Sequence, residues 1–283
     1  VRTLPAMLRA ARSGLVPLDE ATGKRRLALP RGWRMAPKTP LNASVTNQRA
    51  FATRSLPLAE LKQMAKASDT SLNDVVLAIC AGALRRYLAD YDCKPARPLV
   101  AGVPVSLREK DNKDLNNQVS FILVSLATDI KDPIERLLAI HASAATGKRV
   151  TGDVKGAIPT DFPSFGTPWL MSGLASLYGR SGLADRLPPL ANVVISNVPG
   201  PQMPLYLAGA KVATYAPVSI PGHGLALNIT VQSYNGVLEF GLTACRRAVP
   251  DIGDLADYMM EAAQDLGQRL ALELGEVRGQ PRC

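Results

Sequence analysis

The residues in this sequence that could do chemistry begin with a polar cluster, Ser71, Asn73 and Asp74, which opens a long apolar segment. Ser71 and Asp74 have the spacing of a capping box, in which a hydroxyl and a carboxylate accept hydrogen bonds at a helix start. That role does not explain Asn73. A buried amide needs partners, so Asn73 either binds a substrate, clamps a neighbouring loop or satisfies nearby backbone groups.

The two histidines of the chain are the usual candidates for a general base. His141 shares a predicted helical face with Ile134, Leu137 and Leu138, and no acidic residue stands close to it in the sequence. We therefore expect His141 to be a structural residue at the edge of the core. His223 lies between two glycines and could approach a ligand closely, but we expect an exposed loop residue.

A second polar group, Ser196 and Asn197, ends an apolar strand just before the turn Pro199-Gly200-Pro201. Ligands commonly bind where buried strands end, so this position favours a binding role. The alternative is that both side chains satisfy the backbone of the turn itself.

The four cysteines, Cys80, Cys93, Cys245 and Cys283, have no metal-binding or redox spacing, and none has a histidine nearby in the sequence. We predict reduced thiols in a cytoplasmic protein, with no bound metal. The sequence also lacks GxGxxG after a strand, GxxxxGK[ST] and GxSxG. Dinucleotide binding, P-loop chemistry and α/β-hydrolase catalysis therefore lack their motifs.

The charge of the chain is concentrated near its start. Residues 1–40 carry nine Lys or Arg against Asp19 and Glu20, a net +7, whereas the whole chain carries +9. This basic, proline-rich segment is predicted to be an exposed connector with a short helix at 1–13. It suits an anionic phosphate of a lipid headgroup, a nucleotide or a nucleic acid, or it is only a solvated linker. Nucleic acid is the least favoured partner, because no recognition helix or zinc finger pattern is present.

Hydrophobic periodicity predicts an α/β domain with a mixed sheet flanked by helices. Predicted strands cover 50–55, 98–106, 118–127, 192–198, 212–219, 225–233 and 237–243, the last two joined by an Asn235-Gly236 hairpin turn. Predicted helices start near residues 58, 71, 133 and 251, and the last of them ends at Gly275. Residues 168–178 form either a buried helix, a flexible lid or an apolar wall for an acyl chain. No signal peptide or membrane-spanning segment is expected.

Several short motifs together resemble the bacterial wax ester synthase/diacylglycerol acyltransferase family. They are PLN at Pro40, Leu41 and Asn42, SLNDVV from Ser71, PVSLR from Pro104, NQV from Asn117 and NVVISNVPGP from Asn192. The resemblance covers residues 40 to about 274. It implies a chloramphenicol acetyltransferase-like fold, in which two similar α/β domains enclose an active-site tunnel.

By this resemblance, residues 41–283 form the C-terminal domain and residues 1–40 the interdomain connector. The base of the family is a histidine in an HHxxxDG motif of the N-terminal domain, and neither His141 nor His223 stands in such a motif. We therefore expect the chain alone to be inactive. The resemblance assigns to shaping or lining the tunnel the residues Pro40, Leu41, Asn42, Asn73, Asp74, Ser196, Asn197, Pro199 and Gly200.

Two hypotheses of different classes follow. The first is the C-terminal half of an O-acyltransferase that forms wax esters or triacylglycerol from fatty acyl-CoA and an alcohol or diacylglycerol. Its expected partners are its own N-terminal domain and an anionic membrane or lipid-droplet surface, with acyl-CoA as substrate and no bound cofactor. The second is a non-catalytic module of the same fold that binds lipid or docks a partner.

Overall fold

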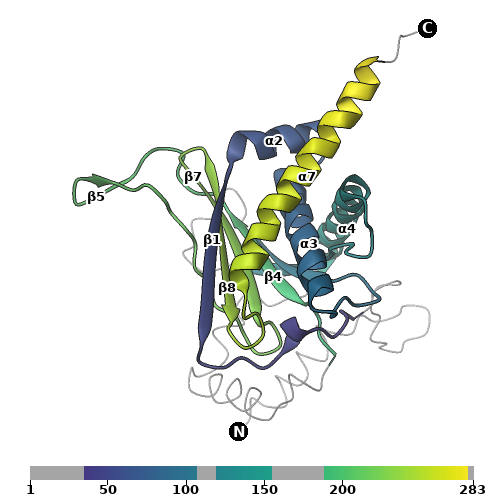
Figure 1. The fold of residues 1–283 in the computed structure, drawn as a ribbon, viewed down its shortest axis with the longest axis vertical. Helices are drawn as coiled ribbons and strands as arrows, with labels where there is room; N and C mark the ends of the chain where they lie inside the picture. The colour runs from purple at the N-terminus through teal and green to yellow at the C-terminus, as the bar shows by residue number, and fades with distance from the viewer. Residues whose placement is uncertain (1–34, 107–118, 155–187, 280–283) are drawn as a thin grey trace.

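A six-stranded mixed sheet with helices packed on one face is the framework of the computed structural model (Figure 1). The structure describes residues 35–106, 119–154 and 188–279. The strands of this sheet are β1 (Arg49–Pro57), β2 (Val100–Ser106), β3 (Val119–Ser125), β4 (Val193–Val198), β7 (Leu227–Tyr234) and β8 (Val237–Cys245). The helices are α2 (Leu58–Ala67), α3 (Leu72–Asp90), α4 (Pro133–Val154) and α7 (Ile252–Gly279), with a short 3-10 turn η1 at Pro40–Asn42. The predicted fold class is confirmed.

The strand order β1-β8-β7-β4-β2-β3 combines a parallel centre with antiparallel edges. β2, β4 and β7 are mutually parallel neighbours, so these three strands end at the same edge of the sheet, here called the carboxyl edge. They begin at the opposite, amino edge. Ligands of open α/β sheets commonly bind beyond the carboxyl edge.

Helix α3 crosses the helical layer between these two edges. α2 begins at the carboxyl edge, where the Leu58 N–H donates to the Gly236 carbonyl in the turn after β7, at 3.0 Å. α3 follows α2 through the helical layer (Figure 1), and the chain after α3 enters β2 at the amino edge. Residues 74–81 of α3 are all buried, because α7, α4 and α2 pack around this helix. The start of the helix is less buried. Ser71, the cap, is exposed and Leu72, the first residue, is half-buried, so the apolar helix does not begin inside the protein.

The strand predictions hold except in one segment. Residues 212–219 form no strand of the described structure; instead β5 (Tyr206–Leu207) and β6 (Ala210–Lys211) make a separate two-stranded hairpin. The Pro217 carbonyl oxygen lies 1.8 Å from where a Cβ of Gly241 would stand, and the Ser219 N–H donates to Thr243 Oγ1 at 3.4 Å. The end of this segment therefore lies over the face of β8, whose two edges are already paired with β1 and β7. The Asn235-Gly236 turn is confirmed, with positive φ at both residues. α7 continues to Gly279, past the predicted end at Gly275.

The end of the predicted connector is not exposed. Ala36, Pro37 and Thr39 are buried, and the Ala36 N–H donates to the Pro189 carbonyl at 3.0 Å. The chain therefore joins the domain before Pro40. The predicted helix at 1–13, the connector up to residue 34 and the segment 168–178 lie outside the described residues. No helix in the described part of the chain has the length and apolar character needed to cross a membrane.

Candidate functional site at the start of helix α3

The predicted capping box forms at the start of α3. The Ser71 N–H donates to Asp74 Oδ2 at 3.0 Å, and the Asp74 N–H donates to Ser71 Oγ at 3.3 Å. The Ser71 hydroxyl also donates to Asp74 Oδ2 at 2.7 Å. These bonds satisfy backbone donors that would otherwise be free at the helix start.

Asp74 also has a partner that sequence spacing could not reveal. His141 Nδ1, on α4, lies 2.8 Å from Asp74 Oδ2. The expectation that His141 lacks an acidic partner is therefore wrong: the two residues stand 67 positions apart, and the antiparallel packing of α4 on α3 brings them together. The core-edge expectation is also wrong, because the His141 side chain is 47% exposed and α4 buries Leu137, Ile140 and Ala144 instead.

The electrostatics of Asp74 reflect two opposing effects. Burial raises the pKa of Asp74, but hydrogen bonds from His141 and Ser71 outweigh burial and hold the pKa below its usual value. Asp74 is therefore ionised at neutral pH. An ionised Asp74 orients the imidazole of His141 through Nδ1, and in the neutral imidazole this leaves Nε2 as an acceptor.

Asn73 stands beside this pair with an unused amide. Its side chain is half-buried and makes no hydrogen bond to any other residue that the structure describes. Among the described residues, no backbone group is bonded to the Asn73 amide. The amide retains both donors and an acceptor for a ligand or a further segment of the protein.

Asn42 has the opposite environment, at the amino edge. It is buried, and its Nδ2 donates to the carbonyls of Ala191 at 2.8 Å and Gly224 at 2.9 Å. Its Oδ1 accepts from Thr39 Oγ1 at 3.0 Å and from Asn192 Nδ2 at 2.8 Å. Asn42 therefore ties η1 to the chain entering β4 and to the loop before β7. Its neighbour Leu41 is fully buried in the core, whereas Pro40 is exposed.

Asn192 is the partner of Asn42 that the sequence analysis did not identify. It appeared there only as the first residue of a predicted strand and of the NVVISNVPGP motif. It is fully buried; its Oδ1 accepts from the Val100 N–H at 2.9 Å, and its Nδ2 donates to the Pro37 carbonyl at 2.6 Å. An uncharged polar residue preceding an apolar run was the available signal, because a buried amide requires partners.

The turn after β4 lies at the carboxyl edge. Ser196 and Asn197 are half-buried, Pro199 is exposed, and the Gly200 N–H donates to Ser233 Oγ at 3.1 Å. A Cβ at Gly200 would stand 2.1 Å from the Ser233 carbonyl oxygen, so glycine is required for this close approach. The predicted tunnel residues therefore divide between two edges of the sheet: Asn42 lies at the amino edge and the β4 turn at the carboxyl edge.

The remaining candidate residues are His223, the cysteines and any metal-ligating side chains. His223 is half-buried, and its Nδ1 has no hydrogen-bond partner in the described structure, so it is less exposed than expected. Cys80 is fully buried, and burial raises its pKa to about 12, which makes it a poor nucleophile. No group of three metal-ligating side chains occurs among the described residues.

Comparison with family models matches most of the chain in two parts. The model for the wax ester synthase/diacylglycerol acyltransferase catalytic domain matches residues 1–76, and that for the WS/DGAT C-terminal domain matches residues 115–267. The first match includes Asn42, Asn73 and Asp74, and the second includes His141 and the β4 turn.

Individual relatives agree. A putative diacylglycerol O-acyltransferase of Mycobacterium tuberculosis is 41% identical over 95% of this chain and 56% of its own length. The O-acyltransferase WSD of Acinetobacter baylyi is 40% identical over 81% of this chain and 48% of its own length. The chain thus spans about half the length of the curated relatives it matches.

Solved structures show the same similarity. The wax ester synthase/diacylglycerol acyltransferase from Marinobacter aquaeolei VT8 has a TM-score of 0.65 and 34% identity, covering 94% of this chain and 64% of that one. The epimerization domain of tyrocidine synthetase B shares the fold alone, with a TM-score of 0.50 at 13% identity, covering 85% of this chain and 53% of that one. The C-terminal domain model matches more than half of this chain, and the relatives are about 40% identical to it. The chain therefore belongs to the wax ester synthase/diacylglycerol acyltransferase family.

Proposed function

We propose that this chain is the C-terminal half of an O-acyltransferase that transfers a fatty acyl group from acyl-CoA to a long-chain alcohol or a diacylglycerol. The observation that carries the proposal is the similarity along 95% of the chain to a relative named as a diacylglycerol O-acyltransferase. The similarity to a wax ester synthase/diacylglycerol acyltransferase of known structure supports the same activity.

In this proposal the start of α3 contributes to binding instead of supplying the base. Asn73 offers, at the start of α3, an amide with no partner among the described residues, and an ester or thioester carbonyl could accept its N–H groups. Asp74 fixes the start of the helix and, through His141, the neighbouring turn of α4. His141 is a positioning residue here, because its Nδ1 holds Asp74 and the proposal assigns the base to the N-terminal domain.

The base comes from the N-terminal domain in this proposal, because no HHxxxDG motif occurs in residues 1–283. A base that accepts the proton of the acceptor hydroxyl lets its oxygen attack the acyl carbon, with CoA thiolate as the leaving group. The boundary between the two domains near residue 40 remains a prediction.

The β5–β6 hairpin supports a contact with the N-terminal domain. It projects away from the sheet (Figure 1), and its strand residues Tyr206 and Leu207 are 65% and 75% exposed. Met203, in the chain that enters the hairpin, is also exposed. An apolar patch of this kind suits burial against another domain.

Association with a membrane or lipid-droplet surface is proposed from the basic segment 1–40. Each Lys or Arg near an anionic surface contributes roughly 1 kcal/mol, so a few engaged side chains would give reversible binding. Five of these cations can be neutralised together: Lys24, Arg25, Arg26, Arg31 and Arg34. Their change to Gln should reduce sedimentation with anionic vesicles at low salt. If vesicle binding is unchanged, the segment is not the attachment site; a raised acyl-CoA KM with intact vesicle binding would instead assign it to CoA phosphates.

The alternative is a non-catalytic module of the same fold that binds lipid or docks a partner. One assay separates the two functions: CoA release from a fatty acyl-CoA and a long-chain alcohol, measured for residues 1–283 and for the same chain joined to an HHxxxDG-containing N-terminal domain. The proposal predicts turnover only in the joined protein. Turnover by residues 1–283 that is lost on His141→Ala or His223→Ala would move the chemistry into this half, and no turnover in either form would favour the module.

A further inference from the structure

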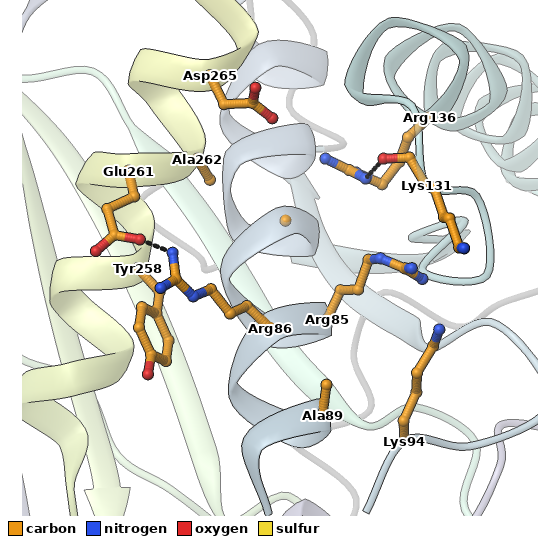
Figure 2. Close-up of a pocket in the computed structure, with 11 residues that line it drawn as sticks. Arg85, Arg86, Ala89, Lys94, Lys131, Arg136, Tyr258, Glu261, Ala262 and Asp265 are labelled. Atoms are coloured by element: carbon orange, nitrogen blue, oxygen red, sulfur yellow. Dashed lines mark hydrogen bonds and ion pairs between the residues drawn. The ribbon is translucent and has the colours of Figure 1, made fainter.

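A basic groove lies between α3, α4 and α7, away from the Asn73 end of α3 (Figure 2). Its volume is about 370 Å³. Five cationic side chains line it, contributed by three separate segments: Arg85, Arg86, Lys94, Lys131 and Arg136. The groove begins at Gly82, about two turns along α3 from Asp74, so it is distinct from the site at the helix start.

Arg136 is the deepest of these cations. It is 5% exposed, and its Nη1 donates to the carbonyls of Ile130 and Lys131, each at 3.1 Å. Its Nε is buried without a hydrogen-bond partner, and it forms no ion pair with a carboxylate of the described residues. A buried guanidinium without a counter-anion is costly, so it needs compensation.

Arg85 adds a second uncompensated guanidinium. Its Nη1 donates to the Thr128 carbonyl at 2.6 Å, and among the described residues it too has no carboxylate partner. Burial and the nearby charge of Arg85 both lower the pKa of Arg136. In Figure 2 the ends of Arg85, Lys94 and Lys131 point into the same side of the groove.

Carboxylates offset this group only in part: the charges of Asp265 and Asp132 raise the pKa of Arg136, but burial and Arg85 outweigh them. Glu261 pairs with Arg86, whose guanidinium also stacks on Tyr258 at 4.4 Å. Asp265 lies on α7, on the far side of the groove from Lys94 and Lys131 (Figure 2), and forms no ion pair within the described structure. Four cations therefore face one free carboxylate.

We propose that this groove is a binding site for a phosphomonoester or pyrophosphate group, held by Arg85 and Arg136 and closed by Lys94 and Lys131. Guanidinium groups bind phosphate oxygens through two parallel hydrogen bonds, whereas the lysines contribute flexible point charges. Such a group is carried by a soluble nucleotide or by the headgroup of an anionic lipid. Both share the chemistry that the groove recognises.

The test is isothermal titration calorimetry of the full 283-residue chain with inorganic pyrophosphate and with adenosine 3′,5′-bisphosphate. It measures the dissociation constant of each anion. Arg85→Gln and Lys131→Gln should each weaken binding, Arg85→Gln by about 10- to 100-fold, the usual effect of removing a charge-assisted hydrogen bond. Arg54→Gln is the matched control, because Arg54 pairs with Asp257 outside the groove and carries the same charge. The control should bind as the unchanged chain does.

Vesicles of phosphatidylcholine with phosphatidic acid separate the two sources. Displacement of pyrophosphate by these vesicles, but not by phosphatidylcholine alone, would assign the groove to a lipid headgroup; displacement only by the bisphosphate would assign it to a nucleotide. The proposal is overturned if neither soluble anion binds, or if Arg54→Gln weakens binding as much as Arg85→Gln does. Circular dichroism melts of each variant show whether lost binding reflects lost folding.

Discussion

Asn42 and Asn73 both belong to short motifs that resemble those of the same family, yet the fold gives the two asparagines opposite environments. Asn42 is 3% exposed and uses both ends of its amide on Thr39, Ala191, Asn192 and Gly224. Asn73 is half-buried and uses neither end on any residue that the structure describes.

The difference separates two kinds of polar motif. A buried, fully hydrogen-bonded amide fixes loops, and its loss leaves partners unsatisfied inside the protein. A half-buried amide with free donors costs the fold little and remains available to a ligand. The amino edge of the sheet is therefore braced, whereas the start of α3 carries an amide with no partner among the described residues.

The largest expected effect on stability is at the brace, the hydrogen-bonded pair Asn42 and Asn192 at the amino edge. Asn42→Ala removes the donor to the Ala191 and Gly224 carbonyls and an acceptor of Asn192, so unfolding free energy should fall by about 2 to 5 kcal/mol. Urea unfolding of this variant, of Asn192→Ala and of the double variant measures it. Because the two amides share a hydrogen bond, the double variant should lose less than the sum. A loss below about 1 kcal/mol for Asn42→Ala would contradict the role of the brace.

The turn at the carboxyl edge should respond less strongly. Gly200→Ala places a methyl group against the Ser233 carbonyl oxygen and forces the turn to shift, at a cost of about 1 to 3 kcal/mol. Gly253 provides the control, because no atom lies within 4 Å of its Cβ position. The melting temperature should therefore fall for Gly200→Ala and hardly change for Gly253→Ala. Equal decreases in the two variants would show that the close approach of Gly200 to Ser233 does not determine stability.

The Asp74–His141 pair predicts a pH dependence. Folding lowers the pKa of Asp74, so its ionised form stabilises the folded chain above the unfolded pKa near 3.8, and this contribution is lost as the pH falls through the lower folded value. Asp74→Asn should cost about 1 to 3 kcal/mol near pH 6, and the deficit should shrink below about pH 4. His141→Ala should weaken the same dependence. A deficit that is constant from pH 6 to pH 3 would show that Asp74 is not held by these bonds.

Local signals predicted most of the fold. The capping box at Ser71 and the Asn235-Gly236 turn depend on neighbouring residues, and both form as expected. The segment 212–219 was mistaken for a strand because its β-branched residues fit one, whereas strand pairing depends on a free sheet edge elsewhere in the chain.

The candidate site was less predictable, because its contacts join distant residues. Asp74 meets His141 across 67 positions, and Asn42 meets Asn192 across 150. The capping-box spacing selected Asp74 and the family resemblance selected Asn42, but neither signal could identify the partner. Burial of Arg136 was equally hidden, since arginine at a helix start is usually solvated.

The smallest expected effect on stability, and the most direct test of the comparison, is Asn73→Ala in the chain joined to an HHxxxDG-containing N-terminal domain, as proposed above. The measurement is kcat/KM for CoA release from a fatty acyl-CoA, taken beside the melting temperature of the same preparation. Because the amide has no described partner, we predict unfolding free energy within about 0.5 kcal/mol of the unchanged protein, with kcat/KM lower by about 10-fold or more. Normal kcat/KM, or a loss of activity that follows a loss of stability as large as that of Asn42→Ala, would contradict the account.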